Sequence, residues 1–135
     1  LPADLLKLIF KLKKNDRIIG ISDSMRGAGL ESGPSILGPK NNGTPTIIEN
    51  GVAVLTDGSG LFAGSVATGI RLVKTLSTLA GLDLPTVFRT ISYNPAKLLG
   101  MEKEIGSIEV GKCADFMLFD KDFKLDSVYI AGEKV

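Results

Sequence analysis

Residues 19–29 read Ile-Gly-Ile-Ser-Asp-Ser-Met-Arg-Gly-Ala-Gly, which places a lone aspartate, Asp23, between an apolar run and a glycine-rich turn. The run starts at Ile18 and lacks polar alternation, as is typical of a strand covered on both faces in a parallel sheet. The parallel strands of α/β barrels present catalytic side chains at their carboxyl ends, where Asp23 lies. Aspartates are also common in turns, so a turn-capping role is an equally good interpretation from these residues alone.

Helical periodicity dominates much of the remaining chain. Apolar residues recur with helical spacing over residues 4–14, and the lysines that end this stretch are expected to face solvent. A second helix is predicted from Ser65, as N-cap, to a stop at Gly81. A third begins near Asp83 and ends by Asn94, because the proline that follows disfavours helical backbone at the preceding residue. Asn94 then caps a fourth, short helix.

Turn and strand patterns fill the other segments. Residues 26–46 are rich in glycine, proline and asparagine and predict a long irregular loop. Asn50-Gly51 predicts a two-residue turn in a hairpin over residues 47–55. Beyond residue 100 the helical period disappears and short strands are predicted at residues 105–110, 114–119, 127–130 and 133–135.

These elements predict an α/β protein with two parts. Residues 1–100 are expected to form the last α/β units of one domain, with an inserted hairpin near residues 47–55. Residues 101–135 are expected to form strands of a second, smaller β domain. The first residue is leucine rather than methionine, and the chain opens directly on a helical pattern, so we expect a piece of a longer chain.

Composition excludes several classes of function. The 135 residues carry a net charge of +1 and 6% aromatic residues, which argues against a nucleic-acid groove. No apolar run approaches the ~20 residues of a membrane span. The single cysteine, Cys113, is expected to be a small buried group, and it fits a reducing compartment, with the cytoplasm as the default. Histidine is absent, so a catalytic triad or a histidine-built zinc site is impossible within this chain alone.

Two glycine patterns resemble nucleotide-binding motifs. Residues 106–113 nearly match a phosphate loop, but a cysteine replaces the final hydroxyl and a strand, not a helix, is predicted to follow. Residues 58–64 carry G-x-G-x-x-x-G, one residue longer than the dinucleotide fingerprint. We interpret the second pattern either as a turn plus a helix entrance or as backbone N–H groups that contact a polar or anionic ligand. The other aspartates are interpreted as turn, cap or strand-flanking residues: Asp57, Asp83, Asp115 and Asp120.

Four motifs together resemble the N-acetylglucosamine-6-phosphate deacetylase family of the amidohydrolase superfamily. They occur in the family's order and cover nearly the whole chain. The last recurs across the amidohydrolases, whereas the first two together select the deacetylase branch. The motifs lie at residues 21–29, 61–65, 91–96 and 106–115.

The resemblance implies that residues 1 to about 99 are the final part of a metal-dependent (β/α)8 TIM barrel, with residues 18–21 as its eighth strand. The tail would complete a small β-sandwich. In this family the aspartate after the eighth strand takes a proton from metal-bound water and delivers a proton to the leaving amine, a role that falls on Asp23. Family contacts to the sugar fall on Phe62, Ala63 and Gly64. The resemblance also implies a homodimer acting on a small sugar phosphate.

The sequence departs from the family at two positions next to Asp23. Ser22 and Ser24 stand where the family more usually has Thr and Ala. The family's divalent metal, zinc or iron, is held by a glutamate and two histidines upstream of this region. The resemblance therefore implies that this chain contains none of the metal ligands. We therefore predict that this polypeptide alone binds no catalytic metal and has no turnover. Alternatives left open are a dihydroorotase-like or deaminase-like amidohydrolase, or a non-catalytic fragment.

Overall fold

The computed structural model describes all residues 1–135 and contains both helices and strands. The chain divides into two compact units. Unit 1 comprises Leu1–Ile21 and Ile70–Val135, and unit 2 comprises Ser22–Gly69. Each unit has its own hydrophobic core.

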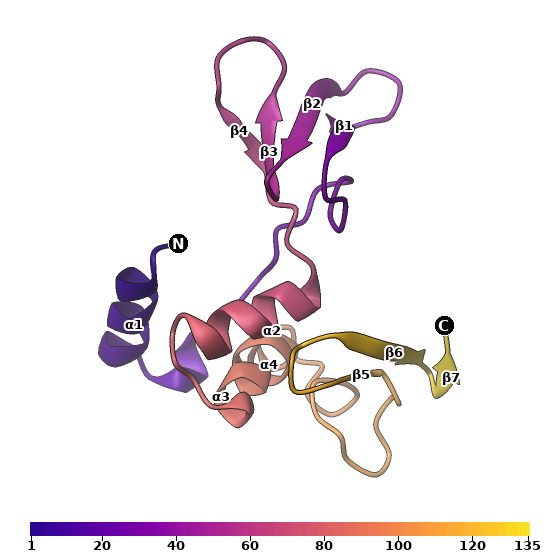
Figure 1. Ribbon diagram of the computed structural model, residues 1–135. Coiled ribbons are helices and arrows are strands. Elements are labelled where there is room, and N and C mark those ends of the chain that lie inside the picture. The colour runs from indigo at the N-terminus through magenta and orange to yellow at the C-terminus, as the bar shows by residue number, and fades with distance from the viewer. The chain divides into compact units, whose positions relative to one another are not determined.

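Unit 1 contains the helices that the sequence pattern predicts, with changed boundaries (Figure 1). The first helix is confirmed, and the lysines at its end are exposed. Asp83 is the N-cap of the third, since its carboxylate accepts a hydrogen bond from the Thr86 amide at 3.2 Å. The helical elements are α1 Ala3–Leu12, η1 Asn15–Arg17, α2 Gly69–Thr78, α3 Leu84–Phe88, η2 Arg89–Tyr93 and α4 Asn94–Leu98.

The elements α3, η2 and α4 follow one another without a break, so the predicted helix end at Asn94 is wrong. The middle element is π-helical, and the Asn94 amide donates to the carbonyl of Arg89. In an α-helix that amide would donate to Thr90, and in a continued π-helix the Thr90 carbonyl would need an N–H group on Pro95, which has none. The Thr90 carbonyl therefore accepts instead from the amide of Gly20, at 3.1 Å.

The core of unit 1 lies among α1, α2 and α3. Val73 and Val87 are completely buried, and they pack with Leu6, Leu76 and Ala80. Partly buried aromatic rings from the end of one tail strand and from the turn after it pack against the same cluster: Phe119 and Phe123. Helices from both ends of this unit and its tail strands therefore share one core.

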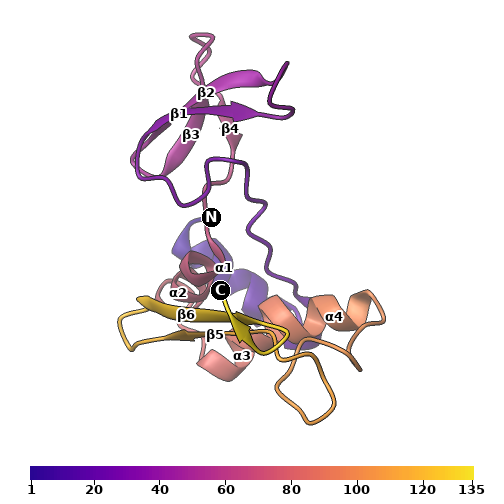
Figure 2. The same cartoon turned by 90° about the vertical axis from the view of Figure 1, so that its right-hand side faces the viewer.

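The tail forms a three-stranded antiparallel sheet in the order β5, β6, β7 (Figure 2). Its strands are β5 Phe116–Phe119, β6 Leu125–Ile130 and β7 Glu133–Lys134. The rings of Phe116 and Tyr129 stack across β5 and β6 with centroids 4.7 Å apart. Three of the four predicted tail strands are thus confirmed, whereas residues 105–110 form turns and loop.

Unit 2 is a four-stranded antiparallel sheet in chain order (Figure 1). The hairpin prediction is confirmed, because Asn50 and Gly51 have φ of 51° and 71° and join β2 to β3. Ile48, Ala53, Ala63 and Val66 form its core. The strands are β1 Gly33–Leu37, β2 Thr44–Glu49, β3 Val52–Leu55 and β4 Phe62–Gly64.

The irregular loop predicted for residues 26–46 is wrong, because β1 and the start of β2 lie in it. The prolines that indicated a loop occupy positions where a strand tolerates them. Pro34 lies on the edge strand β1, and Pro45 lies where β2 pairs with β1 but no longer with β3.

No helix of the structure combines the length and apolar character needed to cross a membrane.

Candidate active site

Asp23 lies at the start of unit 2 with an exposed side chain. Its φ of 49° is in the left-handed region, which aspartate enters more readily than most residues. The predicted strand before it, residues 18–21, belongs to neither sheet, although Ile18 has extended backbone with φ −113° and ψ 133°. Within this chain, residues 18–21 therefore have no strand partner, although they were predicted to form a strand of a parallel sheet.

The segment after Asp23 is bound to the segment after β4. Ser24 and Ser65 form a parallel bridge, and the Met25 amide donates to the Ser65 carbonyl at 2.9 Å. The Ser24 hydroxyl donates to the Ala67 carbonyl. A weaker bond joins the Gly29 amide to the Val66 carbonyl at 3.4 Å. Within unit 2, the chain beside Asp23 and the chain after Phe62–Gly64 are therefore neighbours, although about forty residues separate them in sequence.

The three predicted sugar-contacting residues form β4 and differ in what they expose. The Phe62 ring is 80% exposed and available for apolar contact. Ala63 is 5% exposed and belongs to the core, so its side chain cannot contact a substrate. Gly64 has φ of 139°, and a Cβ added there would lie 3.6 Å from the Met25 side chain. Contacts from Ala63 and Gly64 are therefore limited to backbone groups.

Ser65 does not cap a helix as predicted. Its hydroxyl accepts from the Ala67 amide at 3.1 Å, and α2 begins four residues later, at Gly69. The apolar spacing that predicted a helix extends over residues 65–68. The backbone there does not form a helix, because it pairs with Ser24 and Met25 instead. The glycine-rich stretch 58–64 accordingly ends in strand β4, and the expected helix entrance there is wrong.

The loop between β3 and β4 holds a second exposed carboxylate, Asp57. Its Oδ1 accepts from the Ser59 amide at 2.9 Å, so its interpretation as a turn residue is confirmed. Hydrogen bonds from the Ser59 side chain and then from its backbone hold the pKa of Asp57 below its ordinary value. Nearby in sequence to Asp23, the Arg26 guanidinium is exposed and reaches the Gly38 carbonyl at 3.5 Å.

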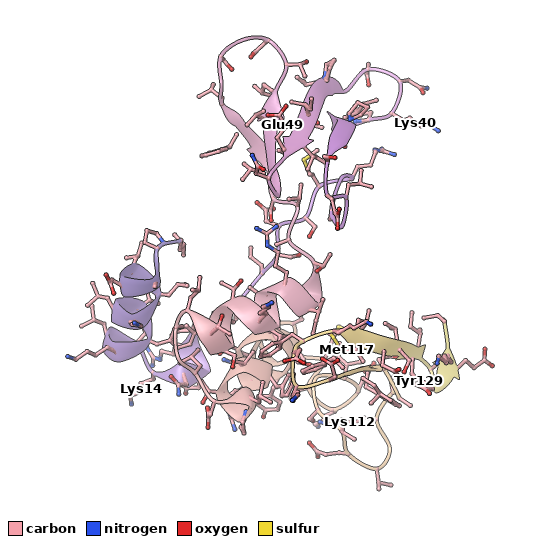
Figure 3. The ribbon with its side chains drawn as sticks, viewed as in Figure 1. Lys14, Lys40, Glu49, Lys112, Met117 and Tyr129 are labelled. Carbon is pink, nitrogen blue, oxygen red and sulfur yellow. The ribbon has the colours of Figure 1, made fainter.

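The residues of the phosphate-loop-like stretch bond to one another. Ser107 donates to Glu109 at 2.6 Å, and Lys112 donates to both Ser107 and Glu109. Lys112 lies in the loop that leads to β5 (Figure 3), so a strand follows the stretch, as predicted. These bonds also lower the pKa of Glu109, first through Ser107 and then through Lys112. Cys113 is exposed, so the prediction that it is buried is wrong.

The remaining aspartates of unit 1 have the expected structural roles. The Asp115 carboxylate accepts from the Ala131 amide at 2.7 Å. The Asp120 carboxylate accepts from the amides of Asp122 and Lys124, both at 2.9 Å. Each aspartate flanks β5, as predicted.

The donor set within residues 1–135 does not fit a catalytic metal. The chain has no histidine, and no group of three or more cysteine, aspartate or glutamate side chains gathers to hold an ion. Asp23 is an exposed carboxylate and belongs to no such group. Three lysines labelled in Figure 3 come from three separate segments of the chain: Lys14, Lys40 and Lys112.

Curated proteins resemble most of this chain over a limited part of their own length. The N-acetylglucosamine-6-phosphate deacetylase of Caenorhabditis elegans is 30% identical over 118 residues, covering 87% of this chain and 27% of that protein. The enzyme of the same name from Vibrio furnissii is 33% identical over 119 residues, covering 88% and 28%. The chain thus spans little more than a quarter of the length of these relatives.

Solved structures and a family model extend the likeness to the fold. The chain matches N-acetylglucosamine-6-phosphate deacetylase from Thermotoga maritima with a TM-score of 0.81 and 30% identity, covering 99% of this chain and 35% of that one. It also matches a mutant N-acetyl-D-glucosamine-6-phosphate deacetylase from Mycobacterium smegmatis, solved in complex with N-acetyl-D-glucosamine-6-phosphate. The TM-score is 0.85 and the identity 26%, and the match covers 99% of this chain and 34% of that one. The model of the amidohydrolase family matches residues 3–135. Since that match covers nearly the whole sequence, the chain belongs to the amidohydrolase family.

Proposed function

We propose that this chain is the C-terminal portion of an enzyme that hydrolyses N-acetylglucosamine 6-phosphate to glucosamine 6-phosphate and acetate. The names of the similar proteins support the substrate. The observation that carries the proposal is the pairing of Ser24 and Met25 with Ser65. It brings the chain beside Asp23 next to the chain that follows Phe62–Gly64, so the proton carrier and the sugar contacts would share one site.

The proposed architecture is the end of a (β/α)8 barrel and part of a small β-sandwich. Residues 1–100 would supply the last barrel units, with residues 18–21 as the eighth strand and the sheet of unit 2 inserted after it. Residues 101–135, including β5–β7, would supply sandwich strands. TM-scores above 0.8 against solved deacetylases support this assignment. Residues 18–21 would then pair with barrel strands contributed by the complete enzyme.

In this proposal Asp23 moves the proton that amide hydrolysis requires. A water molecule adds to the acetamide carbonyl and loses a proton, and the amine nitrogen must gain a proton before the C–N bond breaks. An exposed carboxylate within reach of both atoms accepts the first proton and supplies the second. The Phe62 ring would form an apolar wall against the sugar. Family membership implies a divalent metal in the complete enzyme, with its ligands expected outside the described residues.

The test is acetate release from N-acetylglucosamine 6-phosphate by the complete enzyme that contains this segment. We expect Asp23→Asn to lower kcat by about 10²–10⁴-fold while substrate still binds, because general acid–base groups contribute about that factor. Asp57→Asn is the matched control, since it changes an exposed aspartate of the same unit that has a turn role. This control should retain the parent's kcat.

A panel of N-acetyl sugars and cyclic amides separates the deacetylase from its alternatives. Turnover of the 6-phosphate alone supports the proposal, whereas turnover of a cyclic amide would assign a dihydroorotase-like reaction. An inactive parent, or an Asp23→Asn variant as active as the parent, would contradict the role given to Asp23. The homodimer stays a prediction of the resemblance, tested by sedimentation. The cytoplasmic location stays a prediction from the single cysteine, tested by fractionation of cells.

A further inference from the structure

Ser24 is an exposed serine whose hydroxyl has a partner 43 residues further along the chain. It donates to the backbone carbonyl of Ala67. The neighbouring bond from the Met25 amide to the Ser65 carbonyl uses backbone atoms, so any residue except proline at position 25 could form it. The bond to Ala67 differs, because it depends on the side chain at the position directly after Asp23.

The acceptor of this bond is itself held in place. The Ala67 amide donates to the Ser65 hydroxyl at 3.1 Å, which closes a short turn over residues 65–67. Ser65 also forms the parallel bridge with Ser24. This segment is therefore joined to the turn twice, once through the Met25 amide of the bridge and once through the Ser24 hydroxyl.

The residue before Ser24 has left-handed backbone, and the direction of its side chain depends on that conformation. Asp23 has φ of 49°, in a region that aspartate tolerates better than most residues. Rotation about the bonds joining Asp23 to Ser24 would redirect the carboxylate. A hydroxyl bond at the next residue resists that rotation, whereas the exposed carboxylate has little packing of its own to resist it.

We propose that Ser24 is a positioning residue for Asp23: its bond to Ala67 fixes the direction of the carboxylate toward a substrate that contacts Phe62–Gly64. This inference rests on the proposed function, because it assigns to Asp23 the proton transfer described there. Proton transfer is sensitive to such direction, since donor and acceptor must approach within hydrogen-bond distance. Binding of the sugar uses other groups, so the effect should fall on kcat rather than on KM.

The experiment compares four forms of the complete enzyme: the parent, Ser24→Ala, Ser24→Thr and Ser22→Ala. We expect Ser24→Ala to lower kcat about three- to tenfold, the factor expected for one lost hydrogen bond, with KM within twofold of the parent. Threonine keeps the hydroxyl and suits a bridged, extended segment, so Ser24→Thr should restore kcat. Ser22→Ala removes a hydroxyl on the other side of Asp23 and should leave kcat unchanged.

A second readout reports on the contact rather than on the rate. Hydrogen exchange of the Met25 amide should be faster in Ser24→Ala than in the parent, because the same bridge protects it. An unchanged kcat in Ser24→Ala, or a loss that Ser24→Thr does not restore, overturns the inference. If the parent hydrolyses the substrate and Asp23→Asn does not, that result leaves the proposed function intact. A parent without activity overturns both.

Discussion

The stretches before and after Ile21 are both attached to distant parts of the sequence, but by opposite means. Residues 15–20 are held within unit 1 by a buried amide, Asn94, which is 4% exposed. Residues 24–29 are held within unit 2 by backbone bonds and an exposed hydroxyl, that of Ser24. Buried polar contacts are costly to break, whereas exposed ones are readily replaced by water. The first attachment should therefore govern stability, and the second should govern the geometry of the candidate site.

The attachment before Ile21 uses three hydrogen bonds. Asn94 Nδ2 donates to the carbonyls of Asn15 at 2.6 Å and Ile18 at 2.7 Å, and the Thr90 carbonyl accepts from Gly20. Asn94 also has a buried side-chain oxygen, Oδ1, without a hydrogen-bond partner. The Asn94 side chain thus uses only its donor group, and it does not cap the following helix as predicted.

The largest effect on stability is expected from Asn94→Ala. It removes both side-chain bonds and leaves two carbonyls without these donors, which we expect to lower the free energy of unfolding by about 3 kcal/mol. Urea unfolding of the complete enzyme, followed with hydrogen exchange of the Gly20 amide, measures it. Asn15→Ala is the matched control, because the exposed Asn15 contributes its backbone carbonyl rather than its side chain.

Asn94→Asp sharpens the same test. The shape is kept, but an oxygen replaces the nitrogen that faces two carbonyls, so the loss should be at least as large as in Asn94→Ala. Equal stability of Asn94→Asp and the parent would show that the amide does not secure residues 15–18. The buried attachment through Asn94 would then contribute no more to the free energy of unfolding than the exposed attachment through Ser24.

A pair of glycine substitutions compares how closely the two attachments approach their partners. In unit 2, a Cβ on Gly27 would lie 2.2 Å from Ile48 Cδ1, and Ile48 is completely buried in the core. In unit 1, a Cβ on Gly20 would lie 3.0 Å from Ile91 Cγ2, on a partly buried side chain. We expect Gly27→Ala to cost about 2 kcal/mol by overpacking. Gly20→Ala should cost less than about 1 kcal/mol, because alanine also lowers the entropy of the unfolded chain.

Thermal and urea unfolding of both glycine variants measure the difference. Each is the other's control, since the same methyl group is added to a glycine whose φ is not positive. A larger loss for Gly20→Ala would reverse the comparison of the two close approaches. It would mean that Ile91 cannot move aside and that the core of unit 2 can.

The parts of the fold that the sequence predicted correctly depend on local physics. The first helix follows from apolar spacing, the Asp83 cap from one carboxylate, and the turn at Asn50-Gly51 from two residues that tolerate positive φ. The errors arise where distant residues decide. The π-helical η2 lets the helix continue past Pro95. It also leaves the Thr90 carbonyl available to accept a hydrogen bond from Gly20, 70 residues earlier in the sequence.

The candidate site follows the same division. Chain position alone left Asp23 undecided between catalysis and a turn, and its role came from the resemblance. Its neighbourhood with Phe62–Gly64 depends on the bridge between Ser24 and Ser65, which no local pattern encodes. Ser24 was visible as a departure from the family's usual alanine, but its hydrogen bond to Ala67 appears only in the structure.

The smallest effect concerns two exposed carboxylates, one in each unit. The pKa of Glu109 is lowered first by the Ser107 hydroxyl and then by Lys112, and that of Asp57 by Ser59, which is neutral. NMR titration should find both pKa values below the ordinary ones. Lys112→Met should raise the pKa of Glu109 part of the way back, and Ser59→Ala should do so for Asp57.

Salt distinguishes the two carboxylates further. Added salt should raise the pKa of Glu109, because it screens the attraction to Lys112, and should leave that of Asp57 nearly unchanged. Both folded-state pKa values are depressed, so each group stabilises the protein above its unfolded pKa of about 4 and loses that contribution as pH falls through the folded value. Since both groups are exposed, the loss should be small beside that of Asn94→Ala. An Asp57 as salt-sensitive as Glu109 would mean that a cation acts on Asp57 as well, and the loop of unit 2 would then depend on charge rather than on neutral donors.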